Sequence, residues 1–427
     1  MHIYLPKELV LDIEKAISES WGSCSRSQYR NKIDDTYFLC HYLISKIVGN
    51  EQNASLRQSA SLSSTDMKKY VNKYKKSLQF LIDNYIIKER PSYSTGYNGS
   101  PSFTKSYSFF KRMDLSPVVK IELSNPYLLK KIKGWKNAIA LPSCLVDYQE
   151  AMFGNIYLDV DLAENYVLEL HTNNAYEIMD FYRLYLPIYW LRIGKFYFKR
   201  EESGRLHHTF GGLSKRLRKF LRVKGEASND WVEVDIGSCT PFLFGVYLLQ
   251  QGYNNRSTKI FHDLTTTNDF YSELMEACSY LTVKGGEEVP SDISCFLGKS
   301  NRDSLKKAII KFFYRKFGRN CNRRNGKEFY LYEYIRSCFP SVLKALENLQ
   351  EKFSKEGEKG SMYSLMTSME SSVMINYLVP RLLEKNIPAI TKHDGVLCLR
   401  RDSATIAEII NEGFLEHYGV APYLKIK

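Results

Sequence analysis

The sequence predicts an α+β fold, because short strand-like runs alternate with amphipathic helical patterns along its 427 residues. Near the N-terminus a helical pattern beginning at residue 66 is followed by a strand, a polar loop and a second strand. Farther along, a strand at residues 231–236 and a hairpin at residues 390–399 enclose several helical stretches. Hydrophobic residues make up 44% and charged residues 25% of the chain, which is typical of globular domains.

The charge balance indicates a polyanionic partner. The chain has 60 Lys and Arg against 47 Asp and Glu, a net charge of +13, and 14% of its residues are aromatic. Cations that hold phosphate and rings that stack on bases are the combination used by nucleic-acid-binding proteins. An aromatic core beneath a solvated basic surface would have a similar composition.

The cysteines and the apolar segments bear on the compartment. The nine cysteines form no C-x-x-C pair, which indicates reduced thiols and no structural zinc. No secretory signal is visible, and four charged residues interrupt the most apolar region, residues 178–198. We therefore expect a soluble, cytoplasmic protein without a membrane partner.

Residues 1–120 are typical of a nucleic-acid-binding region. The order helix, strand, loop at residues 91–101, strand is that of a winged helix, and it resembles the winged-helix modules of plasmid and phage replication proteins. Five lysines on or near the helix could follow a phosphate backbone: Lys68, Lys69, Lys73, Lys75 and Lys76. A plain helix and hairpin with a solvated lysine face would have the same pattern. Residues 121–200 are predicted to be a mixed α and β connecting or thumb-like region.

Two carboxylates at strand ends form a candidate metal site. Asp235 lies near the end of the strand Trp231–Ile236, and Asp394 precedes Gly395 in the turn of the 390–399 hairpin. Mg²⁺ prefers hard oxygen ligands and keeps water or substrate phosphates in its other positions, so two aspartates can suffice. Taken singly, each aspartate is as easily explained by a turn or a cap.

A basic helix follows from residue 302. Ten basic residues and one acidic residue lie between Arg302 and Lys327, which is too one-sided for a helix decorated by salt bridges. Arg302 and Lys306 are predicted to neutralise a triphosphate, while Phe313 or Tyr314 stacks on the base. Lys311 and Arg315 are the predicted nucleic-acid contacts of the same helix. A solvated basic helix is the alternative.

In this order the elements resemble motifs A, B and C of family A DNA polymerases and of the related single-subunit RNA polymerases. The motifs are Asp235 at a strand end, then Arg302, Lys306 and Tyr314 on a helix, then His393-Asp394 on a hairpin. The resemblance covers residues 201–427 and implies a right-hand palm, fingers and thumb-like region. It also implies two Mg²⁺ ions, with Mn²⁺ as a substitute, held by Asp235, Asp394 and the carbonyl of Ile236. Asp235, Asp394 and Lys306 are the implied catalytic residues.

Further segments share this resemblance and imply contacts with a DNA primer–template. Residues 203–209 are similar to the segment by which family A enzymes hold the minor groove, which implies contacts from Arg205, His207 and His208. The helical stretch 366–377 resembles the helix before motif C and contains Glu370. His393 is implied to brace the primer end.

The sequence departs from the family pattern at three positions. Thr240 stands where family A DNA polymerases have a Glu that excludes the ribose 2′-OH, Arg315 where Gly is usual, and Glu370 where Gln is usual. The predicted function is template-directed DNA synthesis from nucleoside triphosphates, in a phage, plasmid or other mobile element. No proofreading is expected, because the acidic patch at residues 159–164 lacks the other exonuclease motifs. The alternatives are a primase or RNA polymerase, with RNA as template or primer, and a DNA-binding replication initiator with an inactive polymerase-like half.

Overall fold

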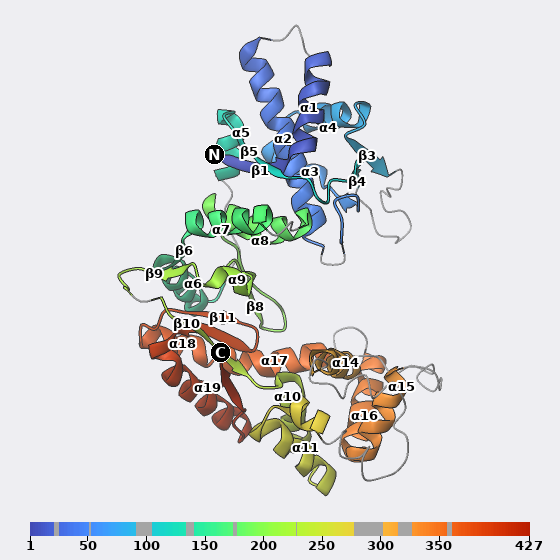
Figure 1. Ribbon diagram of the computed structural model, residues 1–427. Helices are drawn as coiled ribbons and strands as arrows, with labels where there is room; N and C mark the ends of the chain where they lie inside the picture. Colours follow the sequence, from blue (N-terminus) through green and yellow to red (C-terminus); the bar gives the residue numbers. More distant parts are fainter. Residues whose placement is uncertain are drawn as a thin grey trace. The chain divides into compact units, whose positions relative to one another are not determined.

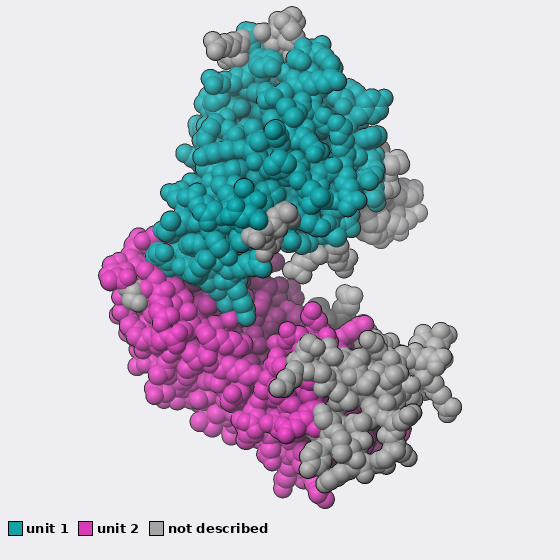
Figure 2. Space-filling view, viewed as in Figure 1, with its two compact units in different colours: residues 1–138, 158–197, 212–222 teal, residues 139–157, 198–211, 223–427 magenta. Residues whose placement is uncertain are grey.

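The computed structural model describes residues 1–20, 25–50, 53–90, 105–133, 141–173, 177–227, 229–276, 302–314, 327–356 and 361–427. They form a mixed α+β structure in which helix predominates, as predicted (Figure 1). The chain divides into two compact units (Figure 2). Unit 1 contains residues 1–138, 158–197 and 212–222, and unit 2 contains residues 139–157, 198–211 and 223–427. Among the described residues, the chain passes between them within β6 (Ile156–Leu158), after residue 197, after residue 211 and within β9 (Leu221–Val223).

Unit 1 is built from helices and two small antiparallel sheets. Its strands are β1 (His2–Pro6), β2 (Ala60–Ser61), β3 (Ile87–Arg90), β4 (Ser106–Phe109) and β5 (Val118–Glu122). Its helices are α1 (Lys7–Ser20), α2 (Arg26–Val48), α3 (Ser64–Tyr70), α4 (Tyr74–Asp83), α5 (Pro126–Lys133), α7 (Val160–Asn173), α8 (Ile178–Arg192) and α9 (Lys215–Arg218). β1 pairs with β5, and the second sheet has the order β2-β4-β3.

The single helix predicted from residue 66 is two helices. Ser63 caps α3, because its side chain accepts a hydrogen bond from the Asp66 amide. The chain then leaves the helical conformation at Val71, whose backbone is extended, and α4 begins at Tyr74. The strands β3 and β4 follow in the predicted order, and the predicted loop at residues 91–101 lies outside the described residues.

The most apolar segment of unit 1 is a buried helix. α8 covers most of the predicted apolar region, and its large rings, those of Tyr182, Tyr185 and Tyr189, are almost fully buried. Two of its charged residues, Asp180 and Arg183, pair with each other at the surface. No helix within the described ranges is long and apolar enough to span a lipid bilayer.

Unit 2 surrounds a four-stranded sheet. Its strands are β7 (Phe198–Arg200), β8 (Leu206–His208), β10 (Trp231–Ile236), β11 (Ala389–Lys392), β12 (Gly395–Leu399) and β13 (Leu424–Ile426). Its helices are α6 (Ser143–Asn155), α10 (Cys239–Gln250), α11 (Arg256–Thr267), α14 (Arg302–Tyr314), α15 (Lys327–Cys338), α16 (Pro340–Glu356), α17 (Met362–Met374), α18 (Leu378–Glu384) and α19 (Ser403–Tyr418), with a 3₁₀ turn at Arg400–Asp402.

The sheet has the order β11-β12-β10-β13, and all its neighbours are antiparallel. Along β10 the side chains alternate, so that Val232, Val234 and Ile236 are buried while Glu233 and Asp235 lie on the other face. Helix α10, apolar on nearly every side, packs beside α11 and α17, and α19 packs on β10. The predicted strand at residues 231–236 and the predicted hairpin are therefore confirmed.

Candidate functional site

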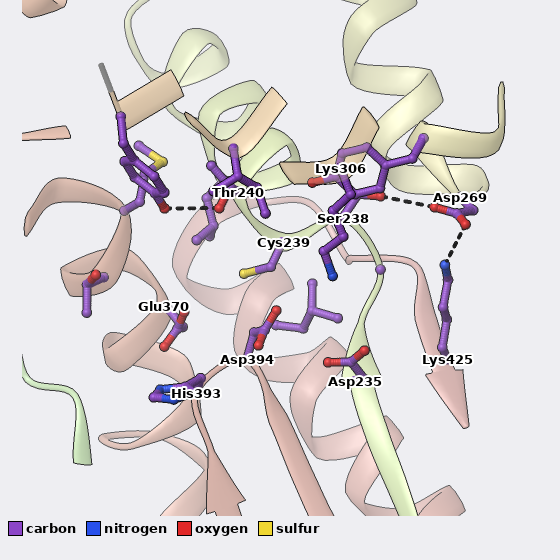
Figure 3. A pocket seen from close by; sticks show the side chains of 18 of the residues that line it. Asp235, Ser238, Cys239, Thr240, Asp269, Lys306, Glu370, His393, Asp394 and Lys425 are labelled. Carbon is purple, nitrogen blue, oxygen red and sulfur yellow. Dashed lines mark hydrogen bonds and ion pairs between the residues drawn. The ribbon is translucent and has the colours of Figure 1, made fainter. Parts of the chain in front are cut away.

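The sheet brings the two predicted metal-binding aspartates together. Asp235 on β10 pairs with Gly395 on β12, and the Ile236 amide donates a hydrogen bond of 3.0 Å to the Asp394 carbonyl. Gly395 leaves room for the carboxylate, because a Cβ atom there would lie 3.2 Å from Asp235 Oδ1. His393 adopts a left-handed backbone, φ 53°, that closes the turn before Asp394. Both carboxylates lie at the base of one pocket (Figure 3).

Helix α14 forms the opposite wall of this pocket, whose volume is about 490 Å³. Four of its residues, spaced four apart, line the pocket: Arg302, Lys306, Ile310 and Tyr314. Lys306 extends from the helix toward the two aspartates (Figure 3). Phe313 lies on the other face of α14, 3% exposed, with its ring centroid 5.3 Å from that of Phe244. Phe313 is therefore a core residue, and Tyr314 is the aromatic residue of α14 that reaches the pocket.

The two aspartates have different electrostatic surroundings. Burial, together with the nearby charges of Asp235 and Glu370, raises the pKa of Asp394 to about 7. Asp394 forms no ion pair with any residue that the structure describes. Asp235, by contrast, is paired with Lys427, whose Nζ lies 2.5 Å from Oδ2.

A buried ion pair joins two of the predicted nucleic-acid contacts. Arg205, which follows Gly204, donates two hydrogen bonds to the Glu370 carboxylate, Nε–Oε1 3.1 Å and Nη2–Oε2 2.7 Å. Its Nη1 also donates to the hydroxyl of Tyr363, at 3.2 Å. Burial raises the pKa of Glu370, although Arg205 opposes that shift. The pair fixes the Arg205 guanidinium at the edge of the pocket.

Asp269 is a pocket residue that the sequence reasoning missed. It accepts hydrogen bonds from Arg302 (Nε–Oδ2 2.7 Å) and pairs with Lys425 (Nζ–Oδ2 3.0 Å), and it lies beside Ser238 (Figure 3). Burial acts to raise the pKa of Asp269, but the hydrogen bonds from Lys425 and Arg302 outweigh it and hold that pKa below its ordinary value. Asp269 thus ties α14 to β13.

Thr240 faces Tyr314 across the pocket. Their hydroxyl groups lie 3.0 Å apart and share a hydrogen bond. Burial is the main cause that raises the pKa of Tyr314 to about 12, so its hydroxyl stays protonated at neutral pH. Thr240, a short polar side chain, therefore occupies the position that the sequence analysis links to discrimination between deoxyribose and ribose.

The remaining predicted residues lie around the pocket or away from it. His393 lines the pocket, and partial desolvation together with the charge of Arg205 lowers its pKa to about 4. His207 lies outside it, 3.0 Å from a carboxylate oxygen of Glu201, with its ring 5.7 Å from that of His393. Lys311 is exposed on α14, and Arg315 lies outside the described residues.

His208 is a core residue. Its side chain is buried, Nε2 lies 2.7 Å from the Thr391 carbonyl, and Nδ1 accepts a hydrogen bond from the Gly211 amide. Burial lowers its pKa to about 4, so the ring is neutral at physiological pH. Both ring nitrogens are used within the protein, and the side chain braces β8 against β11.

Asp235 and Asp394 offer the type of ligand atom that Mg²⁺ prefers. These atoms are hard carboxylate oxygens, and the chain of Ile236 runs between them and lines the same pocket. The raised pKa of Asp394 is the response expected of a desolvated carboxylate beside other carboxylates, and a bound cation would stabilise its charged form. Among the residues that the structure describes, no cluster of three or more His, Cys, Asp or Glu side chains forms a metal site. Water and phosphate oxygens would supply the other ligands.

Three further pocket residues carried no sequence signal: Tyr363, Lys425 and Lys427. Tyr363 reaches the pocket because α17 packs on α10 and α14, and the two lysines reach it because β13 pairs with β10. No local motif predicts these contacts. The acidic patch at residues 159–164 lies in unit 1 and is structural: Glu164 is buried and bonded to His2, Tyr4 and Arg192. The five described cysteines are free thiols.

No family model matches the chain, and no curated protein sequence matches it. Among solved structures, the chain is similar to the polymerase domain of Pol1 from M. smegmatis in complex with DNA primer–template and dNTP, with a TM-score of 0.35 and 12% identity. The match covers 70% of this chain and 62% of that one. This chain thus spans less than two thirds of the length of that domain. A similarity this low carries no argument about function, so the functional proposal depends on the residues of the pocket.

Proposed function

We propose that unit 2 catalyses nucleotidyl transfer, adding nucleotides to a primer that is paired with a DNA template. The observation that carries this proposal is the pocket in which two adjacent aspartates face Arg302, Lys306 and Tyr314. Phosphoryl transfer needs positioning and charge neutralisation more than covalent chemistry by the protein. Carboxylates facing a cationic helix supply both.

We assign each of these pocket residues a role in nucleotide addition. Asp235 and Asp394, with the Ile236 carbonyl, would hold two Mg²⁺ ions, which supply charge neutralisation and activate the primer hydroxyl. Lys306 binds the triphosphate from α14, and Arg302 joins it once the nucleotide competes with Asp269. Tyr314 supports the incoming base or sugar. Arg205, fixed by Glu370, contacts the primer–template beside the neutral ring of His393.

Primer extension on a DNA template with Mg²⁺ tests the proposal, with wild type compared with Asp235→Asn. Synthesis should be lost in this variant while DNA affinity stays, because the change removes a metal ligand and no phosphate contact. Asp263→Asn is the matched control, because Asp263 lies on α11, is highly exposed and does not line the pocket. Extension by Asp235→Asn at the wild-type rate, or no extension by the wild type under any condition, would contradict the proposal and favour a DNA-binding protein with an inactive half.

Ribonucleotide use is a second candidate, and the Thr240–Tyr314 hydrogen bond favours it. A threonine leaves more room beside the sugar than a glutamate does. The same extension assay with ribonucleoside triphosphates decides between the two, and a primer-free reaction tests for a primase. Product formed only from deoxynucleotides and a DNA primer would exclude this candidate.

For unit 1 we propose nucleic-acid binding by α3, α4 and the β2-β4-β3 sheet. The helices lie before β3 and β4 in the order of a winged helix, and the side chains of Lys73, Lys75 and Lys76 are exposed. DNA affinity should fall steeply with salt, because each phosphate contact releases counterions. Replacing Lys75 and Lys76 with Gln should make that dependence shallower. A salt dependence equal to that of the wild type would place the DNA elsewhere.

A further inference from the structure

Strand β13 directs two lysines into the pocket. Asp235 is paired with Lys425 in the sheet register, and the backbone of Lys427 continues the pairing by hydrogen bonds with Glu233. Residues two apart on a strand share a face, so both side chains point the same way. Lys427 Nζ lies 2.5 Å from Asp235 Oδ2, and Lys425 Nζ lies 3.0 Å from Asp269 Oδ2.

The two lysines have different positions relative to the proposed metal site. Lys427 holds an oxygen of Asp235, and its side chain is 48% exposed, so the surrounding residues do not enclose it. Lys425 is 19% exposed, and its carboxylate partner also accepts hydrogen bonds from Arg302. Only Lys427 therefore contacts a carboxylate to which we assign a metal ion.

An ammonium and a divalent cation compete for the same carboxylate. A Mg²⁺ ion binds carboxylate oxygen at about 2.1 Å, and at that distance it repels a neighbouring ammonium group strongly. Once displaced, Lys427 needs another anion within reach of its four-carbon stem. The phosphates that arrive with the metal are such an anion, because they enter the pocket that Lys427 already lines.

We propose that Lys427 is an exchangeable counter-ion: it neutralises Asp235 in the metal-free pocket and passes to the phosphates of the nucleotide when metal binds. The inference rests on the proposed function, and it adds a phosphate-binding residue on the side of the pocket opposite α14. Under this proposal, Lys427 changes its partner when metal binds, whereas a purely structural lysine would stay paired with Asp235 and hold β13 against β10.

Binding of Mn²⁺ alone, followed by electron paramagnetic resonance of the free ion, tests the first half. Lys427→Met should bind Mn²⁺ about tenfold more tightly than the wild type, because the competing ammonium is gone. Lys425→Met is the matched control, since it removes the same charge from the same strand, but from an ammonium group that pairs with Asp269 and not with Asp235. An increase no larger than that of the control would overturn the inference. Lys427→Gln repeats the test with a polar side chain, and thermal unfolding verifies that each variant is folded.

Binding of a non-hydrolysable nucleoside triphosphate with Mg²⁺, measured by calorimetry, tests the second half. Lys427→Met should bind the analogue about tenfold more weakly, so one change alters the two affinities in opposite directions. Tighter Mn²⁺ binding without weaker analogue binding would overturn the transfer to phosphate. Asp235→Asn separates the two proposals: if it binds Mn²⁺ as the wild type does, the metal site itself fails, whatever Lys427 does.

Discussion

Two carboxylates, the buried Glu164 in unit 1 and the half-buried Asp394 in unit 2, have opposite surroundings. Glu164 accepts hydrogen bonds from Tyr4 (2.9 Å) and Arg192 (2.9 Å), and His2 Nε2 lies 2.8 Å from it. Asp394 forms an ion pair with none of the described residues, and its pKa is raised to about 7 by burial and by neighbouring carboxylates.

The difference separates a structural charge from a functional one. A buried charge is costly unless hydrogen bonds or an opposite charge compensate it. The protein compensates Glu164 from its own residues, which ties β1 to α7 and α8. At Asp394 the compensation is incomplete, and a ligand can supply it. Mutating the first should therefore affect folding, and mutating the second should affect activity.

The largest effect is expected for Asp394→Asn. Nucleotide addition should fall at least about a hundredfold, since metal ions contribute several kcal/mol of transition-state stabilisation. The free energy of unfolding should not fall, because the change removes a half-buried charge that no ion pair with a described residue compensates. Single-turnover extension and urea unfolding measure the two quantities. A variant that unfolds more easily yet keeps its activity would show that Asp394 is structural, as Glu164 is.

Glu164→Gln should show the reverse. The change leaves the Arg192 guanidinium without its buried partner, and we expect a loss of about 3 kcal/mol in the free energy of unfolding. Asp161→Asn is the control, because Asp161 pairs with the same arginine but is 79% exposed, and its loss should cost less than about 1 kcal/mol. Equal losses of unfolding free energy in the two variants would mean that the buried carboxylate stabilises the protein no more than the exposed one does.

Within unit 2, Lys306→Ala should weaken triphosphate binding about tenfold, the equivalent of about 1.4 kcal/mol. Lys306 lines the pocket, and Lys307, its neighbour on α14, is exposed and does not. Lys307→Ala should therefore leave the KM for the nucleotide unchanged. Matching KM values in the two variants would mean that the face of α14 at Lys306 does not bind phosphate.

The smallest effect is expected at the Thr240–Tyr314 hydrogen bond. Thr240→Val and Tyr314→Phe each remove one hydroxyl, and the bond should be worth about 1 kcal/mol. A double-mutant cycle on the free energy of unfolding isolates that value. The ratio of kcat/KM for deoxynucleotides and ribonucleotides, measured on the same variants, reports whether the bond also affects the sugar. A coupling energy of zero would mean that the two hydroxyls act independently.

The local elements of the pocket could be predicted from the sequence. Alternating residues indicated β10, an Asp-Gly turn indicated the β11–β12 hairpin, and a basic amphipathic pattern indicated α14. Each of these signals lies within about a dozen residues. The error at Phe313 has a simple cause: the buried face of α14 also contains Leu305, Ile309 and Phe312, and Phe313 continues that face rather than the one at Lys306.

The residues that sequence reasoning missed depend on pairing between distant segments. Lys425 and Lys427 enter the pocket only because β13 aligns with β10, almost 200 positions earlier in the chain. Asp269 gains its role from Arg302 and Lys425, which belong to two other elements. Which distant strands pair is determined by the packing of the whole unit. A short sequence motif therefore cannot predict that these residues reach the pocket.

The strand order of unit 2 also has a consequence for synthesis on the ribosome. β10 is an inner strand, yet both its neighbours, β12 and β13, come from residues 395–426. Until that segment has emerged, β10 has two unpaired edges and Asp235 has neither Asp394 nor Lys427 beside it. Such an edge can pair wrongly with other chains. The nascent protein therefore has no formed pocket until residues 395–427 have left the ribosome, and a chaperone that covers residues 231–236 would protect it during that interval.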